Sequence, residues 1–165
     1  MIVKSISQED IRIIANQLKR APRGLKSIVS RCELNYPLAI ENEAFTEDGK
    51  PFPTIYWLTC PVKIKAISQL EDEGWASKMQ EKIASDETLR NQLYAAQESY
   101  KSKRRSGVKN ASHPLFETGI AGVKDPIAIK CLHAHYAHYL ATGDNPIGKM
   151  VEEKISGLRC TKRCD

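Results

Sequence analysis

The chain has 165 residues with 25 basic and 20 acidic side chains, which gives a formal charge of +5 at pH 7. Its 41% hydrophobic fraction excludes an intrinsically disordered chain, and its length fits one domain with a proper core. A membrane-spanning helix needs roughly 20 consecutive apolar residues and is excluded as well. The N-terminal segment MIVKSISQEDIR has no apolar core of signal-peptide length, so we expect a cytoplasmic protein with no membrane partner.

The first half of the chain predicts two helices and a small amount of sheet. Ser7 is a suitable N-cap, and the apolar spacing after it predicts a helix over residues 8–20. Residues 25–30 alternate weakly, as in a strand. Segments 38–45 and 54–60 predict a β-hairpin across a turn at Asp48–Gly49. Pro61 then opens a predicted helix over residues 62–73.

The second half of the chain is predicted to be helical. The helices are expected at 75–84, from Ser85 or Asp86 to about 103, at 126–142 after Pro126, and at 146–155. The elements together predict an α-dominated α+β fold. In it, a small antiparallel sheet or hairpin packs on about five helices, with helix 126–142 central. Residues 1–158 are expected to form a single domain, followed by a mobile basic tail at 159–165.

One predicted helix carries a cysteine and three histidines within eight residues. At about 100° per residue, Cys131, His135 and His138 fall on one helical face, and His133 points to nearly the opposite side. We interpret the face as a metal or catalytic site. A buried core of hydrogen-bonded histidines is the alternative interpretation.

The five cysteines contain no CxxC pair, which excludes a self-contained zinc knuckle. Cys32 follows a predicted strand and Cys60 precedes a predicted helix, and side chains at such positions converge on pockets. Thiolates of Cys32, Cys60 and Cys131 would hold an iron–sulfur cluster, and a four-iron (4Fe-4S) cluster would keep one open iron. The same three with His135 would form a Cys₃His zinc site. Burial of each cysteine as a small apolar residue is the alternative.

Several sequence blocks are distinctive: Arg31–Cys32, Asp48–Thr54, Tyr56–Pro61, Gly119–Val123, Lys130–His135 and Asn145–Gly148. Together they resemble the bacterial family catalogued as domain of unknown function 501, over roughly residues 23–155. The resemblance implies a small intracellular bacterial protein and carries no established reaction. It also implies that the signature blocks include Arg31, Cys32, Cys60, Cys131, His133 and His135. Cys160 and Cys164 lie outside these blocks, and we treat them as peculiar to this chain.

Basic residues provide candidates for binding an anionic substrate. The run KSKRRSGVK at 101–109 includes Arg104 and Arg105, whose guanidinium groups suit bidentate contacts with phosphate or carboxylate. A solvated helix end is the alternative. Arg31, beside Cys32, would favour the thiolate and hold an anion, and it is a catalytic candidate. Gly122, in the loop GIAG, would permit close approach of a ligand.

Three functions remain open from the sequence. The favoured one is an enzyme with a Cys/His metal centre acting on a small anionic molecule, with His133 or His138 as general acid or base. An iron–sulfur centre would support sulfur removal or transfer, and a zinc centre would support hydrolysis.

The second function is a metal-free thiol enzyme, with Cys131 or Cys60 as nucleophile and His135 or His133 as base. The third is a module that binds RNA or an acidic protein around a structural Cys/His site. Aromatic residues are not interleaved with the basic run, which weakens the case for nucleic acid.

Overall fold

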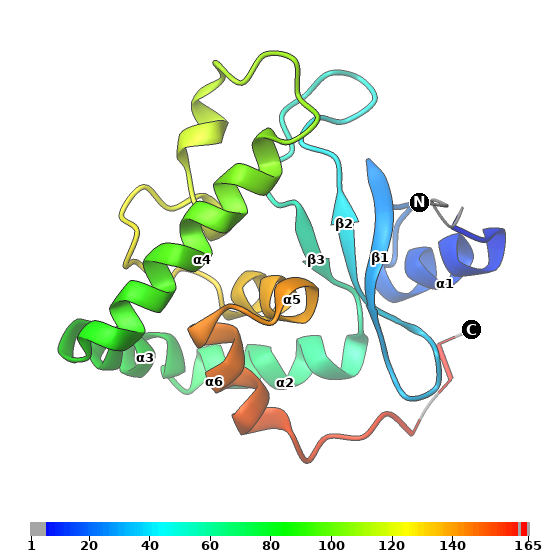
Figure 1. Cartoon of the computed structure of the whole chain (residues 1–165). Coiled ribbons are helices and arrows are strands. Elements are labelled where there is room, and N and C mark those ends of the chain that lie inside the picture. Colours follow the sequence, from blue (N-terminus) through cyan, green and yellow to red (C-terminus); the bar gives the residue numbers. More distant parts are fainter. Residues whose placement is uncertain (1–5, 162, 165) are drawn as a thin grey trace.

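The computed structural model describes residues 6–161, 163 and 164, and its ribbon is drawn in Figure 1. Six α-helices and a three-stranded antiparallel sheet form an α-dominated α+β fold in this part of the chain, which confirms the predicted class. The elements in chain order are α1 (Gln8–Leu18), β1 (Leu25–Arg31), β2 (Pro37–Asn42), β3 (Tyr56–Leu58), α2 (Pro61–Asp72), α3 (Trp75–Ser85), α4 (Glu87–Arg105), the 3₁₀ turns η1 (Pro114–Glu117) and η2 (Ile120–Gly122), α5 (Leu132–Thr142) and α6 (Pro146–Ile155).

The sheet has the order β1-β2-β3, with both pairs antiparallel. Strand β2 is the middle strand, and its Ile40 lies opposite Ile28 on one side and Trp57 on the other. The predicted hairpin is confirmed, although both of its strands are shorter than the sequence pattern indicates. Figure 1 shows α1 on one side of the sheet and the other helices on the opposite side.

Helix α5 is central, as predicted, because it packs against α2, α6 and β3. Its buried apolar side chains, Leu132, Tyr136 and Ala137, belong to the main hydrophobic cluster. The predicted N-terminal boundary at residue 126 is wrong, since α5 begins at Leu132. Cys131 is the N-cap residue and has extended backbone angles.

Two side chains from other helices explain why α5 begins late. The Gln80 amide on α3 donates to the Ile127 carbonyl at 2.6 Å and accepts from the Ile129 N–H at 2.8 Å, so these backbone groups bond to α3 rather than within a helix. Glu71 on α2 then accepts from the Leu132 N–H at 2.7 Å. A carboxylate at this position satisfies one of the unpaired N–H groups of a helix N-terminus and complements its dipole.

Helices α5 and α6 approach each other closely at Gly148. A Cβ atom built at this glycine would lie 2.6 Å from the His135 carbonyl oxygen and would also overlap Tyr139. The turn between the two helices is closed by Asn145, which caps α6 by accepting from the Gly148 N–H at 2.9 Å. This pairing fixes the buried face of α5 relative to α6.

Past α6, the structure describes residues 156–161, 163 and 164. The predicted mobile tail at 159–165 includes Lys162 and Asp165, which lie outside the described residues. Among the described helices, none combines the length and apolarity that crossing a bilayer requires.

Candidate metal centre

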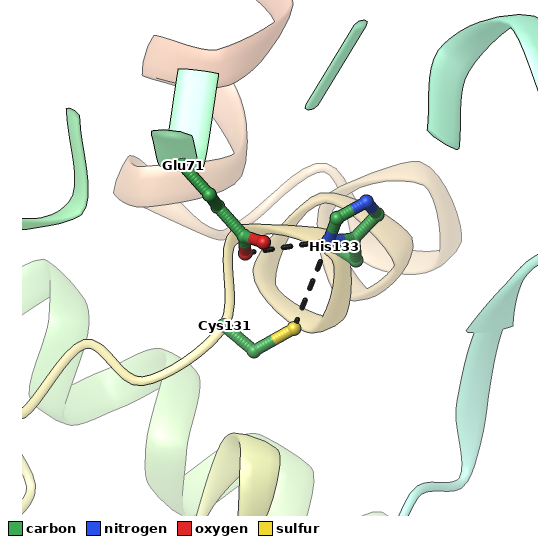
Figure 2. A group of neighbouring side chains, drawn as sticks. All are labelled: Glu71, Cys131 and His133. Carbon is green, nitrogen blue, oxygen red and sulfur yellow. Dashed lines mark hydrogen bonds and ion pairs between the residues drawn. The ribbon is translucent and has the colours of Figure 1, made fainter. Parts of the chain in front are cut away.

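Three side chains of different chemistry meet where the last turn of α2 faces the start of α5. Figure 2 shows Glu71, Cys131 and His133 pointing toward one another. Glu71 Oε1 lies 3.3 Å from His133 Nδ1, and Cys131 Sγ lies 3.9 Å from the same nitrogen. One ligand atom from each residue lies within 4.8 Å of the other two.

The His133 ring is oriented by one face of α2. Ile64, Ser68 and Glu71 are spaced four and three residues apart, which places them on the same side of a helix. The Ile64 carbonyl lies 3.1 Å from His133 Nε2, and Ser68 Oγ lies 3.3 Å from it. Because a carbonyl oxygen can only accept, Nε2 carries a proton. The other ring nitrogen, Nδ1, is therefore turned toward Glu71 and Cys131.

The electrostatics of the group favour positive charge on the imidazole. Burial lowers the pKa of His133, but contacts with the Cys131 thiol, the Ile64 carbonyl and the Glu71 carboxylate outweigh burial and raise it to about 9. The side chains of Glu71 and His133 are both partly exposed. A metal ion that replaces the Nδ1 proton would lie where the carboxylate and the thiol already stabilise positive charge.

A cavity of about 490 Å³ adjoins the group. Its lining combines an aromatic and aliphatic wall with two cationic side chains. The Arg20 guanidinium lies 4.4 Å from the centre of the Trp57 ring. The lining residues are Leu18, Arg20, Thr54, Tyr56, Trp57, Leu58, Ile64, Ala121, Lys130, Cys131, His133 and Ala134. The thiol and the imidazole thus face a space large enough for a small molecule.

The structure does not bring together the three predicted cysteine ligands. Cys131 lines the cavity beside His133, whereas Cys32 and Cys60 line a second cavity of about 340 Å³. The predicted helical face of Cys131, His135 and His138 is wrong, because Cys131 precedes the helix in extended conformation.

His135, a predicted metal ligand, and His138, a predicted acid or base, lie in the core with no exposed surface. Nδ1 of each ring lies 3.1 Å from Nδ2 of Asn145. Burial lowers the pKa of both imidazoles to about 4. This arrangement matches the alternative interpretation of a hydrogen-bonded core.

Of the predicted anion-binding arginines, Arg104 is corrected to a structural residue. Only 2% of it is exposed, and its guanidinium donates to the carbonyls of Pro53, Leu115, Thr118 and Gly119. Arg105 forms an exposed ion pair with Glu117.

The remaining predicted site residues lie near the two cavities or in turns. Arg31 pairs with Asp10 at 2.8 Å and also donates to the Asn35 carbonyl. Its guanidinium is therefore engaged, although the residue lines the same cavity as Cys32. Gly122 ends η2 with a φ of +76°, and its neighbour Ala121 lines the cavity beside Cys131.

Sequence reasoning missed Glu71, the third member of the group. The sequence did offer one indication: the polar residues Ser68 and Glu71 lie on the same face of the predicted helix as Ile64. A polar edge beside an apolar stripe is ordinary for a surface helix, so this signal has little specificity.

Comparison with known proteins gives one family. The family described as "Protein of unknown function (DUF501)" matches residues 28–153. No curated protein and no solved structure matches the chain. The matched segment contains Glu71, Cys131 and His133 and ends before Cys160.

Proposed function

The chain belongs to the DUF501 family, and we propose that it is a zinc-dependent hydrolase of a small anionic molecule. Glu71, Cys131 and His133 would hold the metal ion. The observation that carries the proposal is the meeting of a carboxylate oxygen, a thiol sulfur and an imidazole nitrogen within 4.8 Å of one another beside a cavity.

The spacing of the three atoms suits one zinc ion. Zinc binds oxygen, nitrogen and sulfur ligands at about 2.0–2.3 Å in tetrahedral geometry, so neighbouring ligand atoms are separated by about 3.3–3.6 Å. The two separations from His133 Nδ1, 3.3 Å to Glu71 and 3.9 Å to Cys131, need only a small adjustment. Three protein ligands leave the fourth position for water or substrate, as in catalytic zinc sites.

The surroundings of the ligands support the same assignment. A histidine that binds a metal usually donates its second N–H to a carbonyl or carboxylate, which fixes the ring. His133 makes this contact with the Ile64 carbonyl at 3.1 Å. The Glu71 carboxylate is held in turn by the Leu132 N–H.

A metal-free thiol enzyme fits the contacts less well. In a relay of nucleophile, imidazole and carboxylate, the nucleophile and the carboxylate occupy opposite ring nitrogens. Cys131 and Glu71 instead both face Nδ1 of His133. Because the thiol and the carboxylate both lie beside Nδ1, the three atoms surround one position, and a metal ion would bind there.

The cavity suggests the class of substrate. Zinc with an open position lowers the pKa of bound water to about 7 and so provides a nucleophile at neutral pH. Lys130 and Arg20 would attract an anionic group, and Trp57 and Tyr56 would contact an apolar or aromatic portion. We therefore propose a small ester, amide or phosphoester that carries negative charge.

The test combines metal analysis with a substrate panel. We expect purified protein to contain one equivalent of zinc at this centre, and Glu71→Gln, Cys131→Ser and His133→Asn to bind it at least tenfold more weakly. Glu73→Gln is the matched control, because Glu73 is a nearby acid that pairs with Trp75 instead. Activity on chromogenic anionic esters and phosphoesters should disappear with chelator and return with zinc.

Unchanged zinc affinity in all three ligand variants would contradict the proposal. Chelator-resistant activity that is abolished by Cys131→Ser would also contradict it, and would instead assign the site to thiol chemistry.

A further inference from the structure

Four of the five cysteines gather in a second place, away from Cys131. Cys32 lies in the turn after β1, and Cys60 is the N-cap residue of α2. The chain beyond α6 returns past these two elements, as the red end of the ribbon in Figure 1 shows, and it carries Cys160 and Cys164. Three chain segments that are distant in sequence therefore contribute thiols to one region.

Two adjoining cavities define this region. The first, of about 340 Å³, is lined by Cys32, Cys60 and Cys160, and the second, of about 410 Å³, is lined by Cys160 and Cys164. Val62, in the first turn of α2, lines both. Cys160 therefore lines one cavity together with Cys32 and Cys60 and the other together with Cys164. Thiols that line one cavity and the cavity next to it gain stability when a cation binds their sulfurs.

The surroundings supply positive charge. The two cavities are lined by five basic side chains and two acidic ones, Glu33 and Glu152; the basic ones are Lys19, Arg31, Lys63, Arg159 and Arg163. Arg31 pairs with Asp10, and Glu152 accepts from the Tyr136 hydroxyl. The excess of cations would offset the negative charge of several thiolates.

We propose that Cys32, Cys60, Cys160 and Cys164 form a second metal centre with four thiolate ligands, which would hold an iron–sulfur cluster. Four cysteine thiolates are the usual ligand set of such clusters. A tetrahedral zinc with four thiolates would place neighbouring sulfurs about 3.8 Å apart. Within the described residues, three ligand atoms lie within 4.8 Å of one another only at Glu71, Cys131 and His133, so the four thiols are spaced more widely than a single zinc requires.

This centre is independent of the proposed zinc site. It uses none of the same residues, and two of its ligands lie beyond residues 28–153, the segment that matches the family. Cys160 and Cys164 also follow the last helix, so replacing them leaves the packing of the helices intact.

The test is metal and acid-labile sulfide analysis of the full chain purified without oxygen, together with its visible absorption spectrum. We expect iron and sulfide in the wild type, and at least a fivefold loss of both in Cys160→Ser and Cys164→Ser. Cys131→Ser is the matched control: it removes one thiol of the same chain, at the other centre, and should retain the iron and sulfide. Thermal unfolding of each variant should confirm that the domain is folded.

A second equivalent of zinc that is lost from the two tail variants, while Cys131→Ser loses only the zinc of the other centre, would retain the four-thiolate centre and overturn the cluster. Metal content that is unchanged in both tail variants would overturn the centre altogether. A Cys160–Cys164 disulfide, found by mass spectrometry after thiol alkylation of the anaerobic protein, would overturn it as well.

Discussion

Asn145 Nδ2 lies 3.1 Å from Nδ1 of His138, and the same nitrogen lies 3.1 Å from Nδ1 of His135. One amide therefore donates to two buried rings, and in both of them Nδ1 is the acceptor and Nε2 carries the proton. Neither Nε2 has a hydrogen-bond partner among the described residues. The two histidines are thus held neutral inside the core, where the cost of burying a positive charge outweighs the favourable field of Asp144 at His138.

This arrangement predicts acid sensitivity. The folded-state pKa of each histidine is about 4, below the ordinary value of 6.5, so the unfolded state binds more protons between these limits. The free energy of unfolding should fall as pH decreases from about 6.5 to 4, by on the order of 2 kcal/mol for each histidine at pH 5. Urea unfolding at several pH values measures the slope.

A His138→Phe variant checks the cause, because the ring packs against those of Tyr56 and Tyr100 and an apolar ring would fit there. The slope between pH 6.5 and 5 should become shallower than in the wild type. An equal slope in both proteins would show that other groups control the acid sensitivity.

We expect replacement of Arg104 to lower the free energy of unfolding rather than to weaken ligand binding. Arg104→Met would remove one donor from the carbonyls of four residues, and we expect a loss of about 3 kcal/mol or more in the free energy of unfolding. Arg105→Met, which removes an exposed pair with Glu117, should cost less than about 1 kcal/mol. Similar losses in the two variants would refute the structural role.

Gly148 predicts a packing effect between α5 and α6. Gly148→Ala would force the helices apart, at a cost of about 1–3 kcal/mol, because the new methyl group meets backbone as well as side chain. Gly157→Ala is the control, since a Cβ atom there meets nothing within 4 Å. Thermal unfolding should show a lower midpoint only in the first variant.

Gln80 does not belong to the candidate zinc site, but we expect its replacement to weaken zinc binding there. Its amide holds Ile127 and Ile129 in the segment that leads to Cys131. Gln80→Leu should weaken zinc binding about 10–100-fold, a range typical of residues that orient metal ligands. The exposed Gln92→Leu provides a control. Titration with zinc measures both affinities, and equal values would exclude a positioning role for Gln80.

Much of the fold could be predicted because its signals are local. Ser7, Pro61 and Asn145 each mark a helix start that the structure has within one residue of the expected place. The start of α5 could not be predicted in this way, since Gln80 and Glu71 determine it from other helices. A local pattern that includes Pro126 has no information about those contacts.

The candidate site could be predicted only in part for the same reason. Cys131 and His133 are neighbours in sequence, and their chemistry is visible there. Their partner Glu71 is recognisable only after α2 and α5 have packed. The expected pairing of Cys131 with His135 depended on a helix that begins one residue too late to contain the cysteine.

Part of the lining of the cavity beside Cys131 is a short segment whose backbone is held by residues of α4. Ala121 lines the cavity with a φ of +60°, while its neighbours are tied to α4: Gln97 accepts from the Ile120 N–H at 2.7 Å, and Arg104 holds the Thr118 carbonyl. The backbone of this wall is therefore fixed from behind by residues that a ligand never touches. The side chain at position 121 can then vary in size without moving its support, so ligand selectivity and structural integrity are separable properties of this segment.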